Sequence, residues 1–223
     1  FKIKLAFRNL LKNKLYSFLI IGGFAIGFTA SILIALFYNA EHNVDKHFAH
    51  YKNIYRLYDA KQNKSGLDYK LSAVLSDNYP DIKETCPMEI SIFPTTLKDP
   101  ETKTFIRISN LLITSNAFFD IFSMNIESGL EDKPFSQTNS AVITEAVAKK
   151  LFGDKNPLGR TIKEDFFTAV VTGVVKDLPE NSSFKAELFL NSENKDFQMS
   201  QECNNGVCIY PVEHVLLLKN GVN

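Results

Sequence analysis

Tryptophan is absent from this sequence, and neither sign of charge is in excess. The chain carries 25 basic and 25 acidic residues, without the basic surplus typical of proteins that bind nucleic acid, so we expect no nucleic-acid partner. Phosphate-binding loops of the GxxxxGK(S/T) and GxGxxG types are missing, which argues against ATP binding. No G-x-S-x-G elbow or Cys/His nucleophile pattern indicates a hydrolase. We therefore predict a chain that is not an enzyme and needs no cofactor.

Cysteine is scarce as well, with only three residues. Cys203 and Cys208 enclose the turn-forming Asn205-Gly206 pair, so they are a candidate disulfide across a short hairpin. Cys86 is interpreted as a small buried hydrophobic residue. No CxxC pair or Cys/His spacing indicates structural zinc.

Three histidines are concentrated between Glu41 and His50, in the sequence EHNVDKHFAH. On a helix with about 100° per residue, His42 and His47 would point about 140° apart, so three ligands would not converge on one metal ion. We predict no metal site here and interpret the segment as the exposed continuation of the preceding helix.

A long uncharged hydrophobic run is present from Phe18 to Phe37. Roughly 20 apolar residues in a helix cross a bilayer core about 30 Å thick, so we predict a transmembrane helix over residues 16–40. A cleaved signal peptide fits less well, because the run exceeds the usual 7–15 residues and Tyr38-Asn39-Ala40 lacks the small residue needed for cleavage.

The flank before this run carries basic residues and no acidic ones: Lys2, Lys4, Arg8, Lys12 and Lys14. Residues 1–15 are therefore predicted to form a basic amphipathic helix on the cytoplasmic membrane face, in contact with anionic lipid. The same charges predict a cytoplasmic N-terminus, with the chain after about residue 40 outside the cytoplasm.

Small residues recur every fourth position within the predicted transmembrane helix, at Gly23, Gly27, Ser31 and Ala35. Such a stripe allows another helix to approach closely, and we predict that it is a helix-packing surface. The alternative is that the stripe is incidental, because glycine and alanine are common in transmembrane helices.

The rest of the chain alternates between strand and helix patterns, which predicts an α+β fold. Strands are expected at 53–60, 89–93, 104–114, 140–143, 161–163, 167–176, 186–190 and 214–218. Helices are expected at 69–79, at 116–122 with a cap at Ser115 or Asn116, and from a Thr144 N-cap to a stop at Gly153. Pro157 and Gly159 are assigned to a structural turn, and 177–183 to a polar loop suited to partner contacts.

Several segments, in order, resemble the beginning of the ABC-transporter permeases of the FtsX-like or MacB-like family, in versions common in Bacteroidota. The matching segments are FRNLLKNKLYSFLIIGGFAIGFTASILI, DKHFAHYKNIYRL, NAFFDIFSMNIESG, SAVITEAVAKKLFGDKNPLGRTI and VVTGVVKDLPENSSF. The combination of the LFG-D-x-NPLG-x-T stretch with the basic N-terminal crossing makes the resemblance specific.

The resemblance implies an inner-membrane permease with a MacB-like periplasmic core domain over residues 41–223, porter-like and with a second, smaller lobe inserted at roughly 129–205. It also implies a separate cytoplasmic ABC ATPase, a permease dimer and a periplasmic or outer-membrane partner. The permease would transmit motion for efflux, lipoprotein release or envelope control. Because no second membrane helix precedes Asn223 and the chain begins at Phe1, we expect a fragment of a longer permease.

Two other classes of protein are alternatives. A single-pass membrane sensor would have the same helix followed by a ligand-binding external domain, and the sequence following Asn223 would distinguish it from a permease. A membrane-anchored metalloenzyme would depend on the histidines between Glu41 and His50, whose spacing is unfavourable.

Overall fold

The computed structural model describes residues 12, 14–61, 63, 66–68, 70–91, 94–130, 133–194, 203–204, 207–208 and 212–221, with the backbone alone at 73, 203, 204, 207 and 208. It contains two compact units, Phe1–Val44 and Asp45–Asn223. Most of the predicted basic helix at 1–15 lies outside the described residues.

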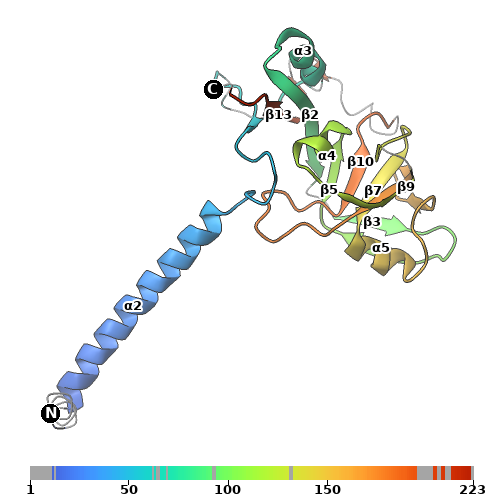
Figure 1. Cartoon of the computed structure of the whole chain (residues 1–223). Coiled ribbons are helices and arrows are strands. Elements are labelled where there is room, and N and C mark those ends of the chain that lie inside the picture. The colour runs from blue at the N-terminus through green and yellow to red at the C-terminus, as the bar shows by residue number, and fades with distance from the viewer. Residues whose placement is uncertain are drawn as a thin grey trace. The chain divides into compact units, whose positions relative to one another are not determined.

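The first unit consists of the helix α2, Lys14–His42 (Figure 1). Its 29 residues correspond to a length of about 43 Å at 1.5 Å per residue, and no charged residue lies between Lys14 and Glu41. The helix is therefore long and apolar enough to cross a membrane.

The second unit is built on an 11-stranded mixed sheet. Hydrogen-bonded neighbours follow the order β1-β13-β2-β5-β10-β7-β9-β8-β3-β4, and β6 pairs with β9 beside this path. The strands are β1 Ile54–Arg56, β2 Ile82–Ser91, β3 Thr95–Lys98, β4 Phe105–Ile108, β5 Leu111–Thr114, β6 Ile126–Gly129, β7 Ser140–Thr144, β8 Thr161–Lys163, β9 Thr168–Val175, β10 Leu188–Asn191 and β13 Glu213–Leu218. The β5–β10 and β7–β9 pairs are parallel, and the other pairs are antiparallel.

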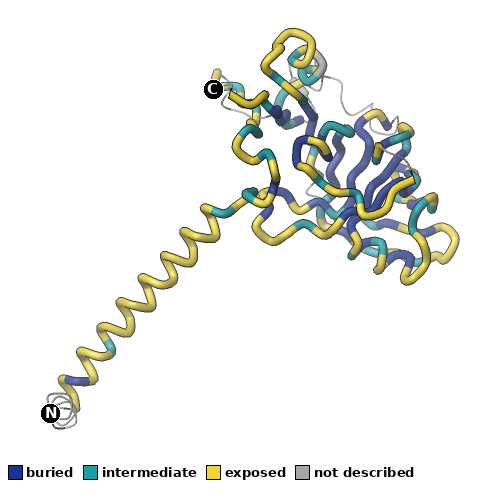
Figure 2. Tube along the Cα trace, viewed as in Figure 1, coloured by how far each residue is buried: buried dark blue, intermediate teal, exposed yellow. Residues whose placement is uncertain are grey.

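The central strands are buried on both faces, as the dark core of Figure 2 shows. Alternate residues along each strand belong to two different hydrophobic clusters because side chains alternate between the faces. In β10, Phe189 belongs to a phenylalanine-rich cluster, whereas Leu188 and Leu190 belong to an aliphatic one. Seven of the 19 phenylalanines belong to this cluster and supply much of one core layer.

Two short helices cover these clusters. In α4, Ala117–Ile121, Phe118 and Phe119 belong to the phenylalanine-rich cluster. In α5, Glu145–Phe152, Val147 and Leu151 belong to the aliphatic cluster. A third helix, α3, Leu71–Asn78, contacts β2.

The predicted α+β class is confirmed, and so are most of the predicted elements. The Thr144 cap is present, because its Oγ1 accepts a hydrogen bond of 3.4 Å from the backbone N–H of Val147, and α5 stops before Gly153 at φ +63°. The predicted strand at 104–114 is instead two strands, β4 and β5. Two strands, β3 and β6, were not predicted.

Asn116 is the N-cap residue of α4, as predicted, but the capping hydrogen bond expected from its side chain is absent. Asn116 makes no cap bond, and instead its amide group bonds the backbone N–H and C=O of Phe135, both at 2.9 Å. This pairing with a residue 19 positions away is favoured because it provides an acceptor for the amide NH₂ and a donor for the amide oxygen of Asn116.

The outcome at the cysteines is mixed. Cys86 is fully buried and free, as predicted, and burial raises the pKa of its thiol to about 12. Two short antiparallel strands, β11 Cys203–Asn204 and β12 Val207–Cys208, place Cys203 opposite Cys208. Their side chains lie outside the described part of the chain, so the disulfide stays a prediction.

The inserted lobe at roughly 129–205 also stays a prediction. Strands β7, β8, β9 and β10 fall within this range, and they share one continuous sheet with β2, β5 and β13.

Candidate functional site: the anchor segment that follows α2

The chain enters the second unit at Asp45, shortly after the end of α2 at His42. Asp45, at φ +58°, donates its backbone N–H to the carbonyl oxygen of Asn181 at 3.1 Å, and its Oδ1 accepts the N–H of Ser183 at 2.8 Å. A non-glycine residue with positive φ is uncommon, and here two long-range hydrogen bonds hold that conformation. We call residues 45–50 the anchor segment.

Phe48 is the hydrophobic part of this anchor. Its side chain is 4% exposed, and its ring lies 5.0 Å from the ring of Phe122 and 5.6 Å, nearly parallel, from that of Phe184. Phe118 extends the same group, with ring distances of 4.7 Å to Phe122 and 5.2 Å to Phe184. The anchor segment is therefore packed into the phenylalanine-rich core.

These contacts correct the interpretation of Glu41–His50 as an exposed continuation of the helix. The helix ends at His42, and turns follow it. His47 Nε2 lies 3.0 Å from the Ser182 hydroxyl, and burying Phe48 requires the chain to leave the helical path.

The partner of the anchor is the loop at 177–184, between β9 and β10. Ser182 and Phe184 are buried, and at the other end of the loop Asp177 Oδ1 accepts the N–H of Ala146 in the first turn of α5 at 3.2 Å. The loop thus contacts both the anchor segment and α5. The sequence predicted a loop suited to partner contacts, and within the described residues its partner is this chain's own anchor segment.

A groove of about 340 Å³ lies where the anchor segment meets the 177–184 loop, a contact that we call the joint. Its walls come from the anchor segment, from the residues after α4 and from the 177–184 loop: they include His47, Phe48, Met124, Glu127, Lys176 and Leu178. Lys176 and Glu127 form an ion pair of 3.0 Å across β9 and β6.

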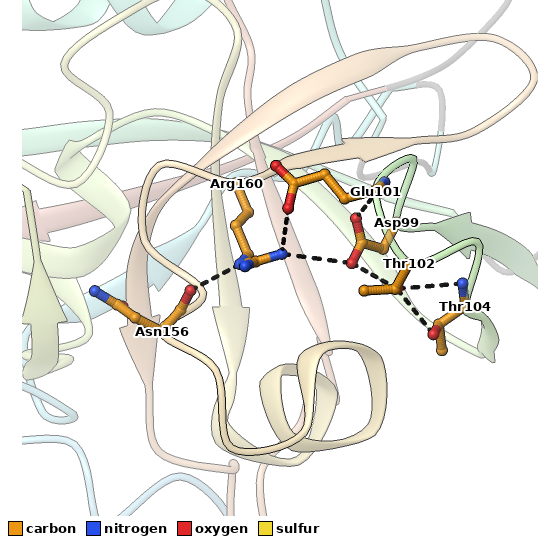
Figure 3. Close-up of polar contacts among 6 residues, drawn as sticks. All are labelled: Asp99, Glu101, Thr102, Thr104, Asn156 and Arg160. Carbon is orange, nitrogen blue, oxygen red and sulfur yellow. Dashed lines mark hydrogen bonds and ion pairs between the residues drawn. The ribbon is translucent and has the colours of Figure 1, made fainter.

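A second polar cluster stabilises the turn predicted at Pro157 and Gly159 (Figure 3). Gly159 has φ +77°, and its N–H donates to Val171 at 2.8 Å. The next residue, Arg160, donates from Nε to the Asn156 carbonyl oxygen at 3.0 Å and from Nη1 to Glu101 at 2.8 Å. This arginine therefore joins the turn to the β3–β4 hairpin.

Asp99, which is 1% exposed, organises that hairpin. Burial by itself would raise the pKa of its carboxyl group, but hydrogen bonds from Thr102 and the backbone N–H of Glu101, together with the charge of Arg160 at 3.7 Å, lower it below the usual value. The lowered pKa favours the ionised carboxylate, whose two oxygens accept hydrogen bonds from within the hairpin.

The predicted helix-packing residues lie on α2. Space is open at the Cβ positions of Gly23 and Gly27, and the Ser31 hydroxyl donates to the Gly27 carbonyl oxygen at 2.9 Å. Ala35 is exposed on the same helix. Within the described residues nothing packs against this stripe, and its role stays a prediction.

Histidine and carboxylate side chains do not form a metal-binding group of three or more among the residues that the structure describes. The contacts of Asp45, Phe48 and Ser183 were not predicted from the sequence. Only the aromatic Phe48 among polar neighbours gave a signal, because the contacts join residues about 138 positions apart.

Comparisons with known proteins identify the class of the chain. The family model described as the MacB-like periplasmic core domain matches residues 17–205, and the chain belongs to this family. Among curated proteins, none matches the chain.

Three solved structures share the fold. A domain assigned to a permease protein from Porphyromonas gingivalis is 19% identical, with a TM-score of 0.66 and 79% of each chain covered. The periplasmic region of MacB from Actinobacillus actinomycetemcomitans is 18% identical, with a TM-score of 0.53, covering 76% of this chain and 75% of that one. The extracellular domain of the ABC-type transporter YknZ from Gram-positive bacteria is 14% identical, with a TM-score of 0.53, covering 75% and 83%.

These findings confirm the resemblance noted in the sequence. The chain combines an N-terminal helix that could span a membrane with a domain of the kind found in ABC-transporter permeases, which fits a protein of the inner membrane.

Proposed function

We propose that this chain is the N-terminal part of an ABC-transporter permease that transmits motion between a cytoplasmic ATPase and the periplasm. The permease does not hydrolyse ATP itself. Family membership supports this function over that of a single-pass sensor. The work performed, in this proposal, is efflux, lipoprotein release or control of the cell envelope.

The anchor segment is the observation that carries the proposal. Only Asn43 and Val44 separate the end of α2 from Asp45, whose hydrogen bonds and the buried Phe48 attach the chain to the core of the domain. Because two residues can span only a short distance, a displacement of the end of α2 should also displace the anchor segment. The 177–184 loop would pass it to α5 through Asp177.

The orientation follows from the basic flank of α2. We propose that the N-terminus is cytoplasmic, in contact with anionic lipid, and that the domain after residue 40 is periplasmic. Asn13→Cys should then be labelled by an impermeant thiol reagent only from the cytoplasm, and Asn63→Cys only from outside. The reverse pattern would contradict this orientation.

We also propose contacts with partner proteins. The stripe of Gly23, Gly27, Ser31 and Ala35 would pack against other helices of the permease or of its dimer partner. A separate ABC ATPase would act on the cytoplasmic side, and a periplasmic or outer-membrane protein would receive the motion.

The test measures ATP hydrolysis in lipid for the co-purified ATPase alone, for the full-length permease alone and for both together. We expect no hydrolysis by the permease and a changed rate in the complex, because coupling requires different contacts with the two states of the ATPase. Intrinsic hydrolysis by the permease, or no effect on the ATPase, would contradict the proposal.

The anchor itself is tested by inserting a flexible Gly-Ser-Gly-Ser linker after Val44. In the unmodified complex, the proposed periplasmic partner should change the rate of ATP hydrolysis. We expect this change in rate to disappear in the insertion variant while the domain stays folded. The control is the same insertion after Asp154, in an exposed turn, which should leave coupling intact. If the partner changes the rate of ATP hydrolysis equally in the two variants, the short connection between α2 and Asp45 is not what transmits motion.

A further inference from the structure

The outer strands β8, β3 and β4 carry an uncovered face. Leu97 of β3 and Ile162 of β8 are fully buried in the aliphatic cluster, on the side where α5 packs. Their sequence neighbours Lys98 and Lys163 point to the opposite face, because side chains alternate along a strand. Within the described residues, these three strands contribute nothing to the phenylalanine-rich cluster that covers the opposite face of the central strands.

Two lysines oppose each other on this face. Lys98 is paired in register with Lys163 on one side and with Phe105 on the other, so the three side chains form a row across β8, β3 and β4. Like charges directly opposite in a sheet are unfavourable. Lys98 is compensated by Asp165 at 2.8 Å, whereas no ion pair of Lys163 is found in the described part of the chain.

A third lysine is held beside the row by the β3–β4 hairpin. The N–H of Lys103 donates to the carbonyl oxygen of Asp99, and the N–H of Asp99 donates to that of Thr104, both at 2.9 Å. Lys103 has φ +58°, a conformation that costs energy for a residue with a Cβ. These backbone hydrogen bonds fix the position of Lys103 in the hairpin, and Lys103 makes no ion pair with any described residue.

The three lysines surround a concavity of about 270 Å³, lined by Lys98, Asp99, Pro100, Lys103, Phe105 and Lys163. Phe105 is 73% exposed, and Phe166 in the β8–β9 turn is 84% exposed. Large aromatic side chains this exposed gain free energy when a ligand removes them from water. In the lining the three lysines outnumber the single Asp99 carboxylate, so the concavity combines a net positive charge with an apolar wall.

We propose that this concavity binds an anionic amphiphile, with a phosphate or carboxylate headgroup among Lys98, Lys103 and Lys163 and an apolar chain against Phe105. The headgroup would neutralise Lys103 and Lys163, for which no ion pair is found among the described residues, whereas Lys98 already pairs with Asp165. A single anionic centre could accept hydrogen bonds from several ammonium groups. The site is separate from the anchor segment, so the inference goes beyond the proposed function and does not depend on it.

The test is calorimetric titration of octyl phosphate, below its micelle concentration, into the full chain in phosphatidylcholine nanodiscs, with empty nanodiscs subtracted. Exposed ion pairs are modest, so we expect Lys163→Gln and Lys103→Asn to weaken binding about 3-fold each and about 10-fold together. Asparagine at 103 tolerates positive φ and so removes the charge without new strain. Lys150→Gln, an exposed lysine on α5, is the matched control and should bind like the wild type.

Further ligands separate charge from hydrophobic contact. Inorganic phosphate should bind more weakly than octyl phosphate, and Phe105→Ser should weaken octyl phosphate without changing inorganic phosphate. If a membrane lipid is the natural source, phosphatidylglycerol in the nanodisc will compete with octyl phosphate for the wild type but not for the double lysine variant. If a free amphiphile is the source, phosphatidylglycerol will have no such effect.

Two results would overturn the inference. One is equal affinity of the wild type and the double lysine variant for octyl phosphate, with both proteins shown to be folded by circular dichroism. The other is binding of octyltrimethylammonium as tight as that of octyl phosphate, because a cation should be repelled by the three lysines.

Discussion

Replacing Phe48 by alanine should separate the anchor segment from the core of the domain. The side chain is 4% exposed and makes two ring contacts, with Phe122 at 5.0 Å and Phe184 at 5.6 Å. Truncating a buried phenylalanine to alanine typically costs about 3–5 kcal/mol, of which each aromatic pair supplies about 0.5–1.5 kcal/mol beyond simple burial. A domain of ordinary stability unfolds with about 5–15 kcal/mol, so the variant should stay folded but much weakened.

Urea denaturation of the full chain in lipid nanodiscs measures this loss. With a denaturant slope of about 2–3 kcal/mol per M, the midpoint should fall by about 1–2.5 M. The matched control is Phe166→Ala, which removes the same side chain from a site that is 84% exposed and should change stability by less than about 0.5 kcal/mol. Because tryptophan is absent, tyrosine fluorescence or circular dichroism follows unfolding.

Hydrogen exchange shows where the loss occurs. The N–H groups of Asp45 and Ser183 bond across the joint, so their exchange should accelerate in Phe48→Ala more than that of the central strands. Equal midpoints for Phe48→Ala and Phe166→Ala, or unchanged exchange at the joint, would refute the view that Phe48 holds the anchor segment.

Three further predictions concern other parts of the chain. Burial lowers the pKa of the fully buried His214 below about 6.5, against the opposing influence of Asp68, so stability should be constant above pH 6.5 and fall by at most about 1.4 kcal/mol per pH unit as pH drops toward the folded-state pKa. His214→Gln should lack this pH-dependent part in denaturation at stepped pH, and an unchanged pH profile would exclude His214 as its source. Gly27→Leu should leave membrane insertion intact and reduce crosslinking to the other permease helices, whereas normal crosslinking would make the stripe incidental. Thr144→Ala should cost about 1 kcal/mol of stability because the N–H of Val147 loses its acceptor, and Thr144→Ser should restore most of it.

Local signals in the sequence were sufficient for much of the domain. Helix α5 is described by three local signals: the Thr144 cap, the apolar face of Val147 and Leu151, and the stop at Gly153. The buried strands β5, β7 and β10 are short apolar runs. These elements were predictable because their structure is determined by residues close in the chain.

Elements that depend on distant partners were not predictable. Strand β6 reads Ile126-Glu127-Ser128-Gly129, with one apolar residue, and it forms through its pairing with β9. In β3 only Leu97 is buried, and the strand forms through antiparallel pairing with β4 on one side and β8 on the other. The anchor has the same origin, since a helical pattern around His47 is overridden by the burial of Phe48 in a cluster built from α4 and the 177–184 loop.

The position of β13 has a consequence for how the protein is made. β1 hydrogen-bonds to β13, with Ile54 opposite Leu217, and β13 in turn separates β1 from β2. During synthesis, α2 can enter the membrane long before residue 217 has been translated. If the domain is exported as proposed, β1 lacks its hydrogen-bonding partner until β13 has also crossed the membrane. Because β1 can join the sheet only after β13 has been exported, the interval before that step is the one most exposed to mispairing and to quality-control proteases.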